Sequence, residues 1–178
     1  MKKKLTEFLD IFLRYLILVL IALPGLWIFY FVFAPLTIYP IYLILGLFLD
    51  VALLGNIILI NNEIPIEIID ACIAGSAYYL LLILNLSTPK IDLKKRVKII
   101  FISFASLLFV NILRILILIL IFMYGFAFFD ITHQFFWYFV STIFVIGIWF
   151  VEVKMFKIKE IPFYSDLRFL YRSSKSKR

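Results

Sequence analysis

The chain has 178 residues, of which 65% are hydrophobic, and its formal net charge is +7. A soluble domain of this length does not need so much apolar surface, whereas runs of about 20 apolar residues cross a bilayer as helices. The composition therefore predicts an all-α integral membrane bundle with no room for a second, soluble domain. We expect a transmembrane domain over residues 1–153 and a basic cytoplasmic tail over residues 154–178.

The basic residues fall into three clusters, Lys2–Lys4, Lys90–Lys98 and Lys154–Arg178. Two segments between them, Gly55–Asp70 and Gly125–Thr132, are acidic and contain no Lys or Arg. Loops rich in Lys and Arg remain in the cytoplasm, so we expect the clusters inside the cell and the acidic segments outside. The basic charge then marks topology and contacts anionic lipid, and nothing in its pattern indicates nucleic-acid binding.

In chain order, the sequence predicts five hydrophobic helices, at residues 8–32, 35–54, 71–86, 97–124 and 131–153. Pro24-Gly25 is expected to kink the first helix. Three segments precede the basic loop at Lys90, an odd number, although both the N-terminus and this loop are expected inside. We therefore expect the second segment, weakened as a span by Pro40 and Asp50, to be re-entrant or interfacial.

Two further elements are expected outside these helices. Residues 56–68 have isoleucines on both sides of Asn61-Asn62, which predicts a short β-hairpin on the outer surface. Residues 173–178 are small, basic and polar, and we expect them to be disordered.

The chemically distinctive residues are expected to share one depth in the membrane. Cys72 and His133, the only Cys and His, each begin a helix at its outer end. Arg114 follows the start of its helix at Val97 by 17 residues, or about 25 Å. In a hydrocarbon core about 30 Å thick, this places Arg114 in the outer part. One Cys and one His do not make a zinc site, and we expect no metal or cofactor.

Each of these residues also has a structural explanation. A lone Cys72 is often a small buried hydrophobe, and His133 could hydrogen-bond lipid headgroups at a helix start. Arg114 could extend its charge toward the membrane surface. However, Asn111 lies three residues before it on the same helical face, which favours a polar-lined cavity.

Taken together, the residues predict an outward-facing cysteine nucleophile. The pKa of a thiol falls at a helix N-terminus and beside cations, which Arg114 and His133 could supply. His133 could move the thiol proton, and Arg114 could hold an oxyanion or a substrate carbonyl. Gly75 and Ser76 are small and would let a substrate segment approach, and Asn111 would help to bind it.

The order Ala71-Cys72-x-x-Gly75-Ser76, then Asn111-x-x-Arg114, then His133 resembles the exosortase/archaeosortase family of multi-pass membrane cysteine transpeptidases. The resemblance implies that Cys72 is the nucleophile and that Arg114 and His133 complete a triad. It also implies substrates that are exported proteins with a C-terminal hydrophobic sorting helix, which the enzyme cuts and transfers to a lipid or other acceptor. Members often carry Cys-Ser-Gly, whereas this chain has Cys72-Ile-Ala-Gly75.

Two other classes of function fit the same residues. In a non-enzymatic membrane assembly or binding protein, Asn111 and Arg114 would hold helices together and Cys72 would only fill space. In a small transporter or channel, Arg114 would line an anion path. The transporter is the weaker alternative, because the sequence contains no internal repeat and few paired intramembrane charges.

Overall fold

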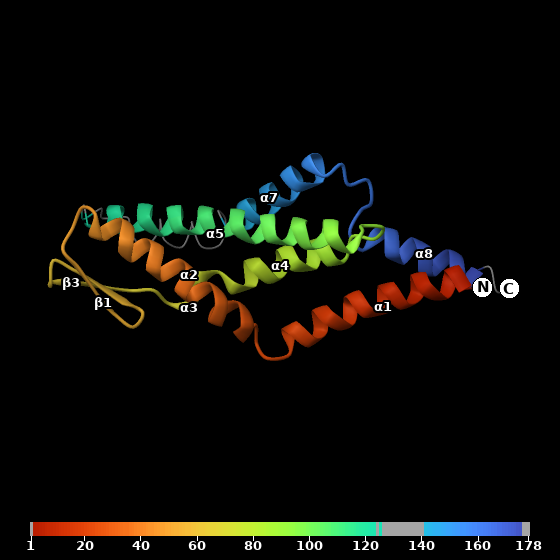
Figure 1. Cartoon of the computed structure of the whole chain (residues 1–178), viewed down its shortest axis with the longest axis horizontal. Helices are drawn as coiled ribbons and strands as arrows, with labels where there is room; N and C mark the ends of the chain where they lie inside the picture. Colours follow the sequence, from red (N-terminus) through yellow and green to blue (C-terminus); the bar gives the residue numbers. More distant parts are fainter. Residues whose placement is uncertain (1, 124, 126–140, 176–178) are drawn as a thin grey trace.

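The computed structural model describes residues 2–123, 125 and 141–175. These residues are mostly helical, with one small antiparallel sheet (Figure 1), which confirms the helical class and the short β element. The helices are α1 (Lys2–Ala22), α2 (Trp27–Gly46), α3 (Asp70–Ile73), α4 (Gly75–Leu86), α5 (Leu93–Met123), α7 (Ser141–Met155) and α8 (Tyr164–Lys175). Two helices of the described chain, α2 and α5, are long and apolar enough to cross a membrane.

The first hydrophobic stretch is divided differently from our prediction. The helix is interrupted between α1 and α2, where Gly25 and Leu26 both adopt positive φ angles, of 63° and 62°. A left-handed residue ends a right-handed helix, so this site is a break and not only a kink. The predicted helix at residues 8–32 is therefore wrong in its boundaries.

The second predicted segment, residues 35–54, is also wrong in its boundaries. Pro35 and Pro40 lie inside α2, which continues to Gly46. Each proline removes one backbone hydrogen bond, but α2 packs against α4 and α5, and this packing supports the helix through both positions. Residues 51–54 form a strand and not the end of a helix.

The course of the helices differs from the one that led us to expect a re-entrant segment, and how residues 35–54 lie in a membrane stays a prediction. Figure 1 shows α1 and α2 following one another along the long axis, α4 returning, and α5 running out again. The N-terminus, the α4–α5 connection and α8 therefore lie at one end of the molecule, and the sheet lies at the other. The first two basic clusters share an end because α1 and α2 together run toward the sheet and α4 runs back from it.

The sheet has three strands, β1 (Val51–Leu54), β2 (Ile57–Ile60) and β3 (Ile64–Glu67), in the order β1-β2-β3. Both neighbouring pairs are antiparallel, and Ile58 is opposite Ile66. Asn61 and Asn62 adopt positive φ angles in the turn, a conformation that asparagine tolerates well. The predicted hairpin is confirmed as β2–β3, with β1 as an additional strand. The sheet leaves β3 as an edge strand.

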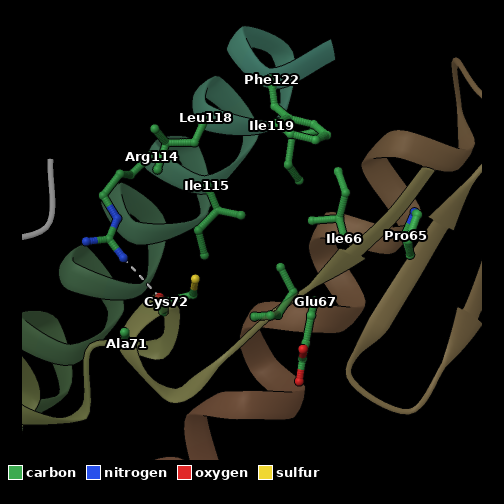
Figure 2. Close-up of a pocket in the computed structure, with 11 residues that line it drawn as sticks. Pro65, Ile66, Glu67, Ala71, Cys72, Arg114, Ile115, Leu118, Ile119 and Phe122 are labelled. Atoms are coloured by element: carbon green, nitrogen blue, oxygen red, sulfur yellow. Dashed lines mark hydrogen bonds between the residues drawn. The ribbon is translucent and has the colours of Figure 1, made fainter. Parts of the chain in front are cut away.

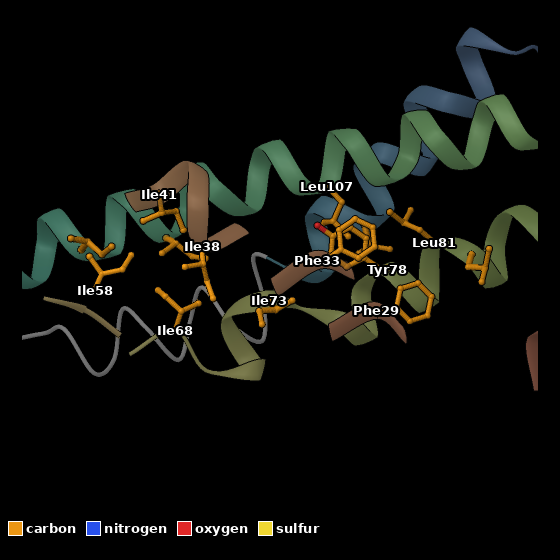
Figure 3. Close-up of a cluster of buried hydrophobic side chains, with 14 of the residues drawn as sticks. Phe29, Phe33, Ile38, Ile41, Ile58, Ile68, Ile73, Tyr78, Leu81 and Leu107 are labelled. Carbon is orange, nitrogen blue, oxygen red and sulfur yellow. The ribbon is translucent and has the colours of Figure 1, made fainter. Parts of the chain in front are cut away.

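Aromatic rings hold the middle of the bundle together. The ring of Phe33 in α2 stacks on Tyr78 in α4, with centroids 3.7 Å apart and an interplanar angle of 11°. Phe104 of α5 presents its ring edge-on to both, at 5.5 and 5.6 Å. Such pairs each add about 0.5–1.5 kcal/mol beyond the burial of apolar area. This cluster continues into buried isoleucines of α2, β2 and α3 (Figure 3), and together they fix α2, α4 and α5 relative to one another.

A buried polar cluster joins four helices at the basic end. Arg14 of α1 pairs with Asp166 of α8 at 3.0 Å and donates a hydrogen bond to the carbonyl of Leu86 at 2.9 Å. Arg96 of α5 donates to the same carbonyl at 2.9 Å. Cations stabilise the C-terminal end of a helix, so the two arginines cap α4. The basic tail is thus anchored to the bundle through α8.

The helical C-terminal region differs from our expectation of disorder. α8 continues to Lys175, so the expectation is wrong for residues 173–175. Residues 176–178 lie outside the described part of the chain. α8 is strongly amphipathic, and Asp166 lies on the side that contacts α1. Burial of this side chain explains why a short polar sequence remains helical.

Replacement of Asp166 with alanine is expected to destabilise the protein by about 3 kcal/mol, because it leaves the buried Arg14 without its main counter-ion. The side chains of Arg14 and Asp166 are only 6% and 4% exposed. Glu160→Ala is the matched control, since its partner Lys90 is 76% exposed and such pairs contribute at most about 1 kcal/mol. Chemical unfolding in detergent micelles measures both variants. Equal losses would contradict the assignment of α8 as an anchored element.

Candidate functional site

Cys72 lies in α3, a single helical turn that is separated from α4 by Ala74. Ala74 adopts a left-handed conformation with φ 60° and ψ 42°. The predicted uninterrupted helix at 71–86 is therefore wrong at this point. In a continuous α-helix, the carbonyl of Cys72 would accept a hydrogen bond from the amide of Ser76. The break removes that donor and leaves the carbonyl available to side chains of α5.

Two side chains of α5 bind the Cys72 carbonyl. Asn111 donates to it from Nδ2 at 2.9 Å, and Arg114 donates from Nη2 at 3.1 Å. Arg114 also donates from Nη1 to the Ser141 hydroxyl of α7 at 2.7 Å. Asn111 and Arg114 are only 3% and 5% exposed. The structure thus brings Cys72, Asn111 and Arg114 together, and it fixes the backbone of Cys72 through donors three residues apart on one helical face.

Arg114 retains unused hydrogen-bonding capacity. Its Nε atom is buried and has no hydrogen-bond partner, and no described carboxylate forms an ion pair with its guanidinium. A buried cation without a counter-ion carries a large desolvation cost. An acceptor oxygen placed beside this guanidinium would therefore be bound favourably.

The thiol of Cys72 faces a cavity of about 230 Å³ between α5 and β3. Figure 2 shows the sulfur directed into this space, while the Cys72 carbonyl receives the bond from Arg114. We call this space the thiol cavity. The residues that line it are Pro65, Ile66, Glu67, Ile68, Ala71, Cys72, Arg114, Ile115, Leu118, Ile119 and Phe122. Most are apolar, and the charged residues among them are Arg114 and Glu67, so polar contacts with an occupant are limited to these two and to the backbone.

Gly75 and Ser76 line a different cavity, of about 500 Å³, on the other side of Ala71. Ser76 is exposed and Gly75 is buried against Tyr30. A Cβ atom at Gly75 would lie 2.8 Å from the Tyr30 ring, so glycine permits close approach of α2 and α4 here. The structure does not place these two residues beside the Cys72 sulfur. Their contribution to substrate binding stays a prediction.

His133 lies outside the described residues, so its position relative to Cys72 stays a prediction. Two other parts of the candidate site were not predicted from the sequence. Ser141 accepts a hydrogen bond from Arg114, but its position at the start of α7 gave no distinctive signal. β3 supplies one wall of the thiol cavity, and its Ile-Pro-Ile-Glu sequence indicated only a strand.

The resting thiol is less acidic than we expected. Cys72 lies outside both helices that are long enough to cross a membrane, and burial raises the pKa of its thiol. A hydrogen bond with the Ile69 backbone and the charge of Arg114 oppose this shift but are smaller. α3 has four residues, too few to develop the N-terminal field of a long helix. Among the described residues, burial therefore outweighs the fall in pKa that we expected from the helix N-terminus and Arg114, and the contribution of His133 stays a prediction.

Alkylation of Cys72 should consequently keep accelerating at pH values where an ordinary thiol, with a pKa of about 8.5, has reached its plateau. A raised pKa reduces the thiolate fraction at neutral pH, so labelling there should be slower than for a free thiol. Arg114→Gln removes the opposing cation and should slow labelling further. Iodoacetamide kinetics in micelles, with N-acetylcysteine as reference, measure the profile. A plateau at lower pH than the reference would show that burial does not dominate.

No family model, curated protein or solved structure matches this chain. The structure itself defines a mostly helical protein with two candidate membrane spans and a small sheet. Within it, a half-buried thiol shares a cavity with a buried arginine. These features are the basis for the function proposed below.

Proposed function

We propose that this protein is a membrane-embedded cysteine peptidase or transpeptidase similar to the exosortase/archaeosortase family. The observation that carries the proposal is the arrangement at Cys72. Its sulfur faces a cavity, and its backbone is held by Asn111 and Arg114. Arg114 also lines this cavity, and its buried Nε has no hydrogen-bond partner among the described residues. A nucleophile with a fixed backbone beside a buried cation suits attack on a carbonyl.

In this proposal the hydrophobic helices form a multi-pass bundle in the cell membrane. The three basic clusters, gathered at one end of the molecule, face the cytoplasm. The sheet and α3, the helix that contains Cys72, lie toward the opposite end (Figure 1), and in this proposal they face the extracytoplasmic side. This orientation suits a substrate that has been exported and is still tethered by a C-terminal hydrophobic helix.

The proposed reaction proceeds through a thioester. His133 takes the proton of the Cys72 thiol, and the sulfur attacks a peptide carbonyl carbon of the substrate. Arg114 stabilises the negative charge on the carbonyl oxygen. The C–N bond then breaks, and the leaving amine takes the proton from His133. Water or an acceptor amine attacks the thioester next, which releases the product and returns the proton to the thiol.

A raised resting pKa is compatible with this mechanism when a base removes the proton during attack. General-base catalysis requires no standing thiolate population. The substrate would also exclude water from the thiol cavity and bring its carbonyl to Arg114. The resting thiol would thus react slowly with small reagents and rapidly with a bound peptide.

A non-enzymatic assembly protein is the second candidate, and a specific observation favours it. The hydrogen bonds that Asn111 and Arg114 make in the described structure all go to groups within the protein, namely Cys72, Ile73 and Ser141. Such contacts are also expected in a protein where they have no role beyond holding α3, α5 and α7 together. In that case Cys72 would be a filler residue.

Co-expression with an exported reporter distinguishes these candidates. The reporter ends in a hydrophobic helix and a basic tail, and its C-terminal segment carries an epitope. The enzyme should release the epitope-bearing segment and leave the rest of the reporter shortened. An assembly protein would leave the reporter intact at every expression level.

A further inference from the structure

β3 forms one wall of the thiol cavity, and the part of β3 that lines it is the edge of the strand. The cavity is lined by four consecutive residues, Pro65 to Ile68. Successive side chains of a strand point to opposite faces of the sheet, so a space on one face would meet only alternate residues. Contact with all four indicates that the cavity runs along the edge of the sheet. Within the described residues, β3 pairs only with β2.

The register identifies the backbone groups on that edge. The amide of Ile68 donates to the carbonyl of Asn56 at 2.9 Å, on the β2 side. Hydrogen-bonding direction alternates along an antiparallel strand. The backbone groups of Pro65 and Glu67 therefore point away from β2, toward the free edge. Proline lacks an amide hydrogen, and a strand tolerates it where that hydrogen would not be needed by the ladder.

Among the described residues, this edge thus leaves the Glu67 amide available as a donor and the carbonyls of Pro65 and Glu67 available as acceptors. At the other side of the cavity lies Arg114, whose buried Nε has no hydrogen-bond partner among the described residues. An extended peptide backbone supplies acceptors and donors for both sides, and its small apolar side chains match the isoleucine and leucine lining. A lipid acyl chain would satisfy none of these polar groups.

We propose that the thiol cavity binds an extended, uncharged peptide segment as an added strand along β3. The segment forms hydrogen bonds with the backbone of Glu67. One carbonyl of the bound peptide then lies at Arg114, beside the Cys72 sulfur. This mode of binding, β-strand addition, obtains affinity from main-chain hydrogen bonds and selectivity from the pockets for alternate side chains. The inference rests on the proposed function for its role in catalysis, but binding itself requires no reaction.

The test uses the full-length Cys72→Ala protein in micelles, so that no chemistry takes place. The probe is an octapeptide of alternating valine and threonine, acetylated and amidated at its ends. Bound peptide should slow hydrogen exchange of the Glu67 amide at least 10-fold. Binding should weaken at least 10-fold in Glu67→Pro, which removes the edge donor, and change less than 3-fold in Glu67→Ala, which keeps it.

A second measurement does not depend on the folding of any variant. N-methylation of the peptide at every second residue should weaken binding at least 10-fold for one set of alternate positions and much less for the other. Equal effects at both sets, absence of peptide binding, or binding without protection of Glu67 would overturn the proposal. If protection of the Glu67 amide depended on protein concentration and not on peptide, the proposal would also be overturned, and β3 would instead pair with a second copy of the protein.

The outcomes separate this inference from the proposed function. If Cys72 is not a nucleophile, the reporter remains intact while the peptide still binds to the Cys72→Ala protein. If β3 does not bind substrate, peptide binding fails while the reporter is still processed by the unmodified protein.

Discussion

Replacement of Cys72 with alanine should abolish processing of the exported reporter while leaving the protein folded. Loss of a catalytic nucleophile lowers the rate on the order of 10³-fold or more. The hydrogen bonds from Asn111 and Arg114 go to the backbone carbonyl of Cys72, so alanine retains them. The cost in stability should therefore stay below about 1 kcal/mol.

The combination of lost activity and retained stability is what distinguishes a nucleophile from a packing residue. Reporter processing in cells gives the activity, and chemical unfolding of the purified variant gives the stability. Wild-type processing by Cys72→Ala would exclude the thioester mechanism. A large loss of stability would show instead that the sulfur packs in the core.

Arg114→Gln should reduce both activity and stability, and the loss of activity should be disproportionate. The variant loses the donors to the Cys72 carbonyl and the Ser141 hydroxyl, which should cost about 1–3 kcal/mol. Loss of a cation that stabilises the oxyanion should lower kcat by about 10²–10³-fold in addition.

Asn111→Ala is the matched control for Arg114→Gln, because it removes the other donor to the same carbonyl. Its stability should fall by a similar amount, but it keeps the guanidinium and should retain more of the activity. Comparison of kcat at equal amounts of folded protein separates the two effects. If both variants lose activity in proportion to stability, Arg114 only holds the helices together.

The approach of Arg114 to Cys72 could be predicted from the sequence because it depends on simple geometry. The charge clusters gave a direction to each hydrophobic segment, and the rise of 1.5 Å per residue gave the depth of Arg114. The same reasoning placed Asn111 on the face of Arg114, three residues away. These relations are local to one helix or follow from charge, and they need no knowledge of packing.

The break at Ala74 could not be predicted, because alanine has the highest helix propensity and rarely adopts a left-handed conformation. Here, tertiary contacts override that preference. Asn111 and Arg114 replace the helical donor at the Cys72 carbonyl, and they come from a helix 39 and 42 residues away in sequence. Single-sequence patterns contain no information on such a contact.

β1 was missed for a different reason. Val51–Leu54 is a short apolar run, and its periodicity is the same for a buried strand and for the end of a membrane helix. Gly25 and Leu26, in contrast, carried a usable signal: Pro24-Gly25 marked the correct position, but a helix break was interpreted as a kink. The shifted boundaries changed how many hydrophobic segments precede Lys90, and the re-entrant segment stays a prediction.

The most direct test of the central claim is to capture the acyl-enzyme by mass spectrometry. The purified protein is incubated with the reporter, and the reaction is quenched in acid, which preserves thioesters. The proposal predicts a covalent adduct on the peptide containing Cys72, with the mass of the shortened reporter, that hydroxylamine removes. An unmodified Cys72 under conditions in which the reporter is being processed would contradict it.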